Sequence, residues 1–200
     1  MIDFSFFRLL TDWGFIAAKK IQAELDKHFP KVMGDVKIPL YITACNFDTE
    51  ELRVFDSEKD KMADLVKVVR ASISIPIVFT PVEIGKDLYV DGGVQRNFAI
   101  DLFGNTEKSV GLYFSEKKGR KPRPKGMKAL GGYISRIIDM LISAKTKDDI
   151  EDASRATVIP LRSNISSVDF SLSKEEIRKM IKSGYDQTDA WIKNNPGKLI

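Results

Sequence analysis

Residues 87–93 read Asp-Leu-Tyr-Val-Asp-Gly-Gly, a short apolar strand that ends on the carboxylate of Asp91. Open α/β sheets carry their chemistry at the carboxyl ends of strands, so this position suits a functional carboxylate. Gly92 and Gly93 are expected to give backbone freedom, including positive φ, and to let a ligand or another backbone approach closely. Because Asp-Gly is also common in hairpin turns, the motif alone is compatible with a turn carboxylate that accepts backbone N–H bonds.

The stretch before this motif carries a second block. Residues 71–76 read Ala-Ser-Ile-Ser-Ile-Pro, and an apolar run, Val-Phe-Thr-Pro-Val, follows at 78–82. In this order and spacing, residues 69–102 resemble the third and fourth sequence blocks of patatin-like phospholipases. The resemblance implies a three-layer α/β/α fold and a Ser–Asp dyad that hydrolyses phospholipids or other acyl esters. Asp91 would be the dyad Asp, which accepts the proton of the Ser.

Four residues near the motif are expected to support the site: Ser72, Ser74, Pro76 and Asn97. Neither serine has flanking glycines, so we expect both to bond backbone groups where a helix ends before Pro76, rather than to act as nucleophiles. Asn97 is expected either to orient the Asp91 loop or to be an ordinary turn residue. The family usually has Asn-x-Pro after the glycines, whereas this chain reads Asn-Phe-Ala, which loosens a turn rather than removing chemistry.

The other half of the family pattern does not occur in the sequence. The 200 residues contain no glycine-rich oxyanion loop and no Gly-x-Ser-x-Gly elbow, the turn that exposes the Ser Oγ beside backbone N–H donors. We therefore expect a single, N-terminally incomplete patatin-like domain over residues 1–200, with the resemblance strongest over 38–191 and no nucleophile in the chain. Alone it should be inactive. Its open apolar strand edges should make it need the missing N-terminal segment or self-associate.

Two other functions stay open on the sequence alone: a non-catalytic patatin-like descendant that binds lipid or a partner protein, and a basic binder of anionic surfaces or nucleic acid. The second arises because residues 117–125 hold six cations: Lys117, Lys118, Arg120, Lys121, Arg123 and Lys125. No aromatic side chain lies between them to stack on bases, so no nucleic acid is expected. This run is expected to be either a solvated loop or a contact with an anionic membrane.

The composition is that of an ordinary globular protein, 43% hydrophobic and 30% charged, and the length fits one domain. The single cysteine, Cys45, lies in an apolar stretch and is expected to be a buried thiol, while the single histidine, His28, is expected at a helix end on the surface. We expect no metal site and no cofactor. The N-terminus lacks the pattern of a secretory signal, which favours a cytoplasmic protein, peripheral at membranes if the cationic run contacts lipid. A signal in a missing N-terminal segment would change that expectation.

Hydrophobic periodicity predicts helices over 12–29, 62–71, 127–144, 148–155 and 174–193, and strands over 38–44, 52–55, 82–84, 88–90, 109–114 and 157–161. Asp12 is expected to cap the first helix, and Ser173 with Glu176 forms a capping-box pattern for the last. The strands over 38–55 and over 82–90 read as two hairpins. Helices alternating with strands predict an α/β domain with a largely parallel sheet.

Overall fold

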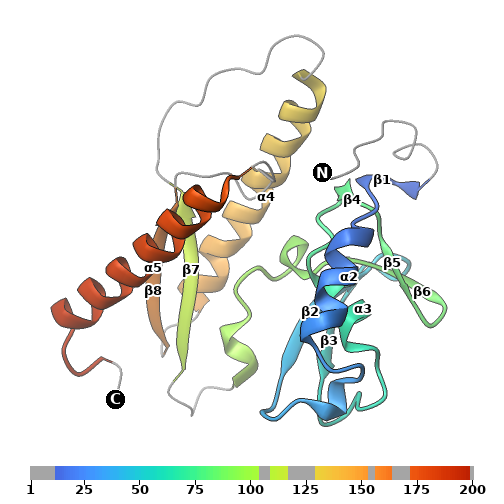
Figure 1. Ribbon diagram of the computed structural model, residues 1–200, viewed down its shortest axis with the longest axis horizontal. Helices are drawn as coiled ribbons and strands as arrows, with labels where there is room; N and C mark the ends of the chain where they lie inside the picture. Colours follow the sequence, from blue (N-terminus) through green and yellow to red (C-terminus); the bar gives the residue numbers. More distant parts are fainter. Residues whose placement is uncertain (1–11, 104–108, 117–128, 153–155, 164–171, 199–200) are drawn as a thin grey trace. The chain divides into compact units, whose positions relative to one another are not determined.

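The computed structural model describes residues 12–103, 109–116, 129–152, 156–163 and 172–198. The chain forms two compact units, one of residues 1–97 and 141–146 and the other of residues 98–140 and 147–200. Both units combine helices with strands (Figure 1). The mixed α/β class expected from the sequence is therefore confirmed.

The first unit is built on a four-stranded sheet in the order β3-β2-β6-β5. Its strands are β2 (Tyr41–Asn46), β3 (Glu51–Asp56), β5 (Val82–Ile84) and β6 (Asp87–Asp91). Every neighbouring pair is antiparallel, so the prediction of a largely parallel sheet is wrong for this sheet. The reason is local, because both predicted hairpins form and short turns can join only antiparallel strands. In the first hairpin, Asn46 Oδ1 accepts the N–H groups of Asp48 (2.9 Å) and Thr49 (3.1 Å) and so fixes the turn.

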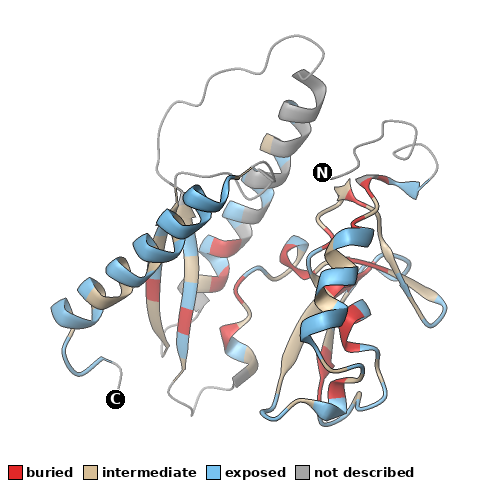
Figure 2. Cartoon of the chain, viewed as in Figure 1, coloured by how far each residue is buried: buried red, intermediate tan, exposed pale blue. Residues whose placement is uncertain are grey.

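One helix supplies three of the seven buried residues in the apolar core of this sheet. Helix α3 (Leu65–Ser72) begins at Asp64, whose carboxylate accepts the Lys67 N–H (3.0 Å), and it ends before Pro76 as predicted. Its buried face packs on β2, β5 and β6, and Figure 2 shows buried residues gathered along α3 and the strands. The buried members of this core are Met33, Ala44, Phe55, Leu65, Val68, Ala71 and Tyr89. Strand β6, which ends at Asp91, therefore packs on this buried core.

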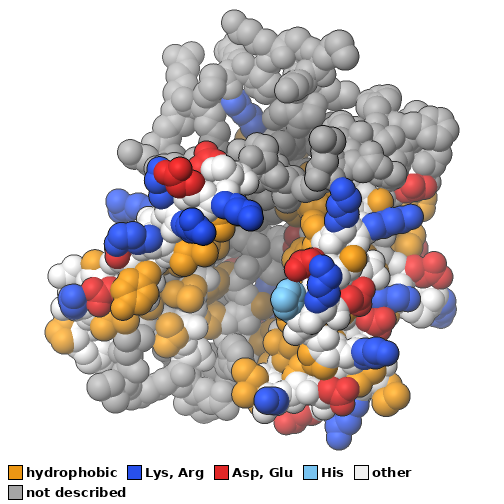
Figure 3. All heavy atoms as spheres, viewed as in Figure 1, with side chains coloured by type: hydrophobic (Ala, Val, Ile, Leu, Met, Phe, Trp, Pro, Cys, Tyr) orange, Lys and Arg blue, Asp and Glu red, His pale blue; other side chains and the backbone are white. Residues whose placement is uncertain are grey.

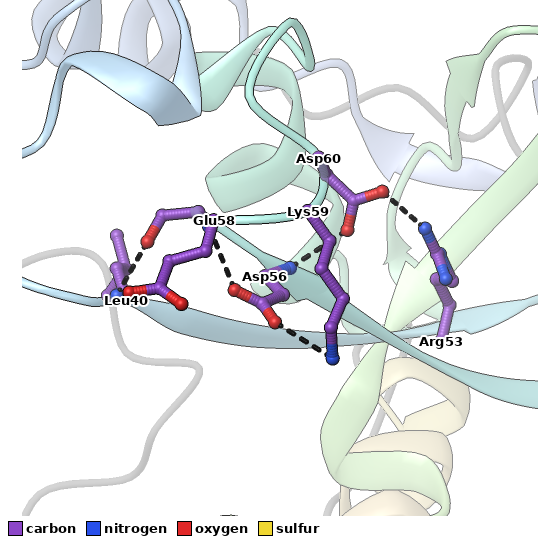
Figure 4. Close-up of polar contacts among 7 residues, drawn as sticks. Leu40, Arg53, Asp56, Glu58, Lys59 and Asp60 are labelled. Atoms are coloured by element: carbon purple, nitrogen blue, oxygen red, sulfur yellow. Dashed lines mark hydrogen bonds and ion pairs between the residues drawn. The ribbon is translucent and has the colours of Figure 1, made fainter.

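A turn of polar residues joins β3 to this helix (Figure 4). The Asp60 carboxylate accepts the Asp56 N–H (2.9 Å) and pairs with Arg53 (2.5 Å). The Asp56 carboxylate accepts the Glu58 N–H (2.9 Å) and contacts the Lys59 ammonium (3.2 Å). These bonds satisfy the backbone of a turn that leaves the sheet, and we assign them a structural role.

The N-terminal segment departs from the single helix predicted over 12–29. Residues Gly14–Ile16 form strand β1, which pairs in parallel with β4 (Ile77–Phe79), and only Lys19–His28 form a helix, α2. Asp12 therefore does not cap this helix, since Ala18 precedes it in the left-handed region at φ 50°. A side chain at Gly14 would collide with the Phe79 and Thr80 backbone. Tertiary pairing with β4 thus overrides the helical spacing of the local sequence.

In the second unit, β7 (Val110–Glu116) pairs in parallel with β8 (Thr157–Ser163), and helix α5 (Lys174–Asn194) packs on β8 (Figure 1). The predicted capping box at Ser173 and Glu176 is confirmed. The helices predicted over 127–144 and 148–155 are one helix, α4 (Ala129–Asp152), because no breaking residue separates them. Two of its apolar side chains, Ile137 and Leu141, are exposed. Over the described part of the chain, no helix combines the length and apolar character needed to cross a membrane.

Candidate functional site

Asp91 is the last residue of β6, where the sheet ends and the chain turns. Its backbone is held on both sides, because it pairs with Ala44 of β2 and donates its N–H to the Ser74 carbonyl oxygen (2.9 Å). Its side chain is half-buried, and Oδ1 accepts the Gly93 N–H (2.7 Å) at the start of a 3-10 turn, Gly92–Val94. The carboxylate thus lies at a strand end, with its backbone fixed by two separate segments.

The protonation of this carboxyl is perturbed by its surroundings. Burial raises the pKa of Asp91 to about 6, and the Gly93 N–H opposes that rise. Within the described residues, Oδ2 accepts no hydrogen bond, so one oxygen is open to an incoming donor. A half-buried carboxyl with a pKa near neutral and a free acceptor oxygen can take a proton from a neighbouring hydroxyl.

Close approach of the backbone requires a glycine at position 92, whereas Gly93 is crowded only by side-chain atoms. A Cβ at Gly92 would lie 2.5 Å from both Thr43 O and Thr43 Oγ1, and one at Gly93 would lie 2.7 Å from Asn97 Oδ1. Neither glycine has a positive φ, so that part of the expectation is wrong. The turn presses against β2 on one side and against Asn97 on the other. Asn97 also donates to the Thr146 hydroxyl.

The two serines of the upstream block lie in different settings. Ser74 is fully buried, and its hydroxyl donates to the Arg70 carbonyl (2.6 Å) and accepts from the Arg70 guanidinium. Ser72 is the half-buried last residue of α3, and Pro76 is half-buried just before β4. The Ser74 hydroxyl thus bonds a backbone carbonyl at the end of α3, while the Ser74 carbonyl accepts the Asp91 N–H and brings the two residues together.

The sequence reading missed Arg70, which is only 2% exposed. Its guanidinium donates to Ser74 Oγ and to the Thr80 carbonyl (3.2 Å) and lies 5.2 Å from the centroid of the Phe79 ring. Burial lowers the pKa of Arg70 to about 10, so the group is still charged at neutral pH. One signal was available: Arg70 follows Val66 by four residues, so the two lie on the same face of the predicted helix.

The turn into β4 contains a strained residue, Ile77, at φ 71°. This left-handed region is unfavourable for a β-branched side chain, so we expect Ile77→Gly to be more stable than Ile77→Ala by about 1 kcal/mol. At the adjacent Val78, in the same small apolar cluster and without positive φ, the order should reverse, with Gly less stable than Ala. Urea unfolding of the four variants tests this. If Ile77→Ala is more stable than Ile77→Gly, glycine relieves no strain at this position.

The remaining candidate residues lie as follows. Cys45 is buried, as predicted, with its Sγ 3.8 Å from Gly92 O, and burial raises the pKa of its thiol. His28 ends α2 on the surface, as predicted, and it contacts Glu24 (3.2 Å). The cationic run over 117–125 lies outside the described residues. No group of three or more potential metal-ligating side chains occurs among the residues that the structure describes.

Comparison with known proteins adds an independent line. A sequence model of the patatin-like phospholipase family matches residues 2–103, which include Arg70, Ser74, Asp91 and Asn97. The chain is 25% identical over 195 residues to an uncharacterized protein, R571, of Acanthamoeba polyphaga mimivirus, covering 90% of this chain and 66% of the relative. It is 30% identical over 97 residues to a probable lipid hydrolase, 463L, of Invertebrate iridescent virus 6, covering 48% of this chain and 29% of the relative.

A third relative is the uncharacterized protein YqhO of Bacillus subtilis (strain 168). It is 25% identical over 139 residues, which cover 66% of this chain and 47% of the relative. The chain therefore spans less than two thirds of the length of each of these three curated relatives.

Proposed function

The chain belongs to the patatin-like phospholipase family, and we propose that it supplies Asp91 as the proton acceptor of a Ser–Asp dyad that hydrolyses lipid acyl esters. The observation that carries the proposal is the Asp91 carboxyl itself. It lies at a strand end with Oδ1 held by the Gly93 N–H, Oδ2 open within the described residues, and its pKa raised by burial to about 6.

In this mechanism the Ser Oγ attacks the ester carbonyl carbon while its proton passes to the open oxygen of Asp91. The tetrahedral intermediate collapses, and the leaving alcohol takes the proton back from Asp91. Water then attacks the acyl-enzyme, gives a proton to Asp91, and releases the fatty acid as that proton returns to the Ser. Because the pKa of Asp91 is near neutral, the same group can accept and return the proton at physiological pH.

We place the nucleophile outside these 200 residues. Two observations support this: the sequence contains no Gly-x-Ser-x-Gly elbow, and the chain spans less than two thirds of each curated relative named above. Ser74 is a poor substitute, since its hydroxyl is bonded twice to Arg70 and the fold buries it completely. Ser72 lacks the flanking glycines of a nucleophile elbow.

Exposed apolar faces in the second unit are consistent with a larger fold. Along α5, the side chains of Ile177, Ile181 and Tyr185 are exposed, Tyr185 by 74%, and Figure 3 shows hydrophobic side chains gathered over this helix. On β7, Phe114 is 72% exposed. Such surface favours association, so the isolated chain should self-associate unless further polypeptide covers it.

We also propose that the protein is cytoplasmic and binds peripherally to membranes. The six cations of residues 117–125 would contact anionic headgroups, and the substrate would be a lipid. Sedimentation with vesicles that contain or lack phosphatidylserine tests the membrane contact. Equal binding to both kinds of vesicle would contradict an electrostatic contact.

The experiment on the catalytic role begins with the transcript. We expect the sequence upstream of Met1 to encode, in frame, a Gly-x-Ser-x-Gly elbow. The extended protein should hydrolyse a short-chain p-nitrophenyl ester, whereas residues 1–200 alone should not exceed background. An extended protein that lacks the elbow and does not hydrolyse the ester, yet binds phospholipid vesicles, would instead support a non-catalytic lipid-binding descendant.

A further inference from the structure

Arg70 is a buried charge that the proposed chemistry does not use directly. Its contacts in the described part of the chain are a hydroxyl, a carbonyl and an aromatic ring, with no carboxylate among them. Burying a cation without an anionic partner is costly, and an apolar side chain of similar length would fill the same space at lower cost. The energetics therefore favour a role for the guanidinium fork rather than for the volume of the side chain.

The fork joins two points of one loop. One arm holds Ser74 Oγ just after α3, and the other holds the Thr80 carbonyl just before β5. Between them the chain makes the Pro76 turn and strand β4. The Phe79 N–H bonds the Ile75 carbonyl (2.9 Å) within the same loop, and Arg70 closes the loop across its two ends. Its two-armed contact fixes orientation as well as distance.

This loop bears directly on Asp91. The Ser74 carbonyl accepts the Asp91 N–H (2.9 Å). This bond continues the edge of β6 that pairs with β5 at residues 87–89. The hydroxyl of the same Ser74 is bonded twice to Arg70. A continuous path therefore runs from the guanidinium through Ser74 to the backbone of the carboxylate.

We propose that Arg70 is a positioning residue for Asp91. Arg70 clamps Ser74 and Thr80, so that the Ser74 carbonyl fixes the Asp91 backbone. Its functional meaning rests on the proposed role of Asp91 as the dyad base. Arg70 does not touch substrate. It sets where the carboxylate stands and how much water reaches it.

The test uses amide hydrogen exchange and carboxyl ¹³C NMR on the 200-residue chain. In Arg70→Met, the protection of the Asp91 amide should fall about tenfold or more relative to the amide of Met33, which bonds Ala63 in the same unit (2.9 Å) and reports general opening. The pKa of Asp91 should also fall toward its ordinary value as water enters the loop. Arg70→Lys should be intermediate, because an ammonium can reach only one of the two acceptors well.

A matched control is available in Arg53. It also lies over a phenylalanine ring, Phe55 at 5.3 Å, and pairs with Asp60. Among the described residues its side chain makes no bond to Ser74, Thr80 or Asp91, although its backbone is paired with Ala44 of β2. Arg53→Met should leave the Asp91-to-Met33 protection ratio and the pKa of Asp91 unchanged. If Arg70→Met does not fold, Arg70→Lys and Ser74→Ala provide the same comparison.

If the Asp91 amide stays fully protected in both Arg70→Lys and Ser74→Ala, the clamp is wrong. It is also wrong if Arg53→Met lowers the protection of the Asp91 amide as much as Arg70→Met does. These readouts require no turnover. An extended protein that does not hydrolyse esters, but in which the Asp91 amide still depends on Arg70, would count against the proposed function and leave the clamp standing.

Discussion

Asp91→Asn is expected to stabilise the first unit at pH 7 while removing its proposed chemistry. Burial raises the pKa of Asp91 from an ordinary value of 3.8 to about 6, so the folded state prefers the protonated carboxyl. The penalty for ionising it is absent below about pH 4 and complete above about pH 6, where it is worth about 3 kcal/mol. Stability of the wild-type chain should therefore fall as pH rises through this window.

Asparagine removes the charge and keeps an oxygen that can accept the Gly93 N–H. We expect the free energy of unfolding of Asp91→Asn to exceed that of the wild type by about 2–3 kcal/mol at pH 7 and to match it at pH 4. In a protein that includes the nucleophile, turnover should fall about 100- to 10,000-fold. Urea unfolding at the two pH values and p-nitrophenyl ester hydrolysis are the measurements.

Asp64→Asn is the matched control for this prediction. Asp64 also accepts a backbone N–H, that of Lys67 at the start of α3, but it caps a helix on the surface of the same unit. Because asparagine caps helices about as well as aspartate, its effect should be within about 0.5 kcal/mol at both pH values. If Asp91→Asn proves less stable than the wild type at pH 7, the carboxylate is a structural turn residue, and the proposed role loses its main support.

Gly92→Ala is the second substitution with a large expected effect. The added Cβ would lie 2.5 Å from the carbonyl oxygen of Thr43 and 2.7 Å from its carbonyl carbon. Thr43 belongs to β2, which pairs with β3 at Thr43 and with β6 from Ala44 onward, so its backbone is held in the sheet. We expect a loss of about 2–4 kcal/mol in the free energy of unfolding, because overpacking against backbone finds no side chain that could rotate away.

Two other glycines distinguish steric collision from backbone conformation as the cause of destabilisation. Gly85, in the β5–β6 turn, has φ 67° and open space around it, so Gly85→Ala should cost about 1 kcal/mol through conformation alone. Gly184, within α5, has neither restriction, and Gly184→Ala should raise stability by about 0.5–1 kcal/mol. Urea unfolding and amide exchange in β6 and α5 would measure all three. A Gly92→Ala cost no larger than that of Gly85→Ala would show that the turn can move away from β2.

How far the sequence could predict the site depended on the range of the interactions. Asp91 at the end of a strand, the turn at Asn46 and the Ser173 capping box depend on residues a few positions apart, and each forms as predicted. The helix expected from Asp12 failed because a parallel partner, β4, lies more than sixty residues further along the chain. Local spacing carries no information about such a partner.

By itself the sequence determined the family, the α/β class, and the position of the Asp91 carboxylate at a strand end, because motifs and periodicity are local properties of the chain. Only the tertiary structure decided what surrounds that carboxylate. The raised pKa of Asp91, the contact that excludes a side chain at Gly92, and the clamp of Arg70 on Ser74 and Thr80 all depend on segments from different parts of the chain meeting in one place. Burial and close approach are properties of the packed fold, and no single stretch of sequence contains them.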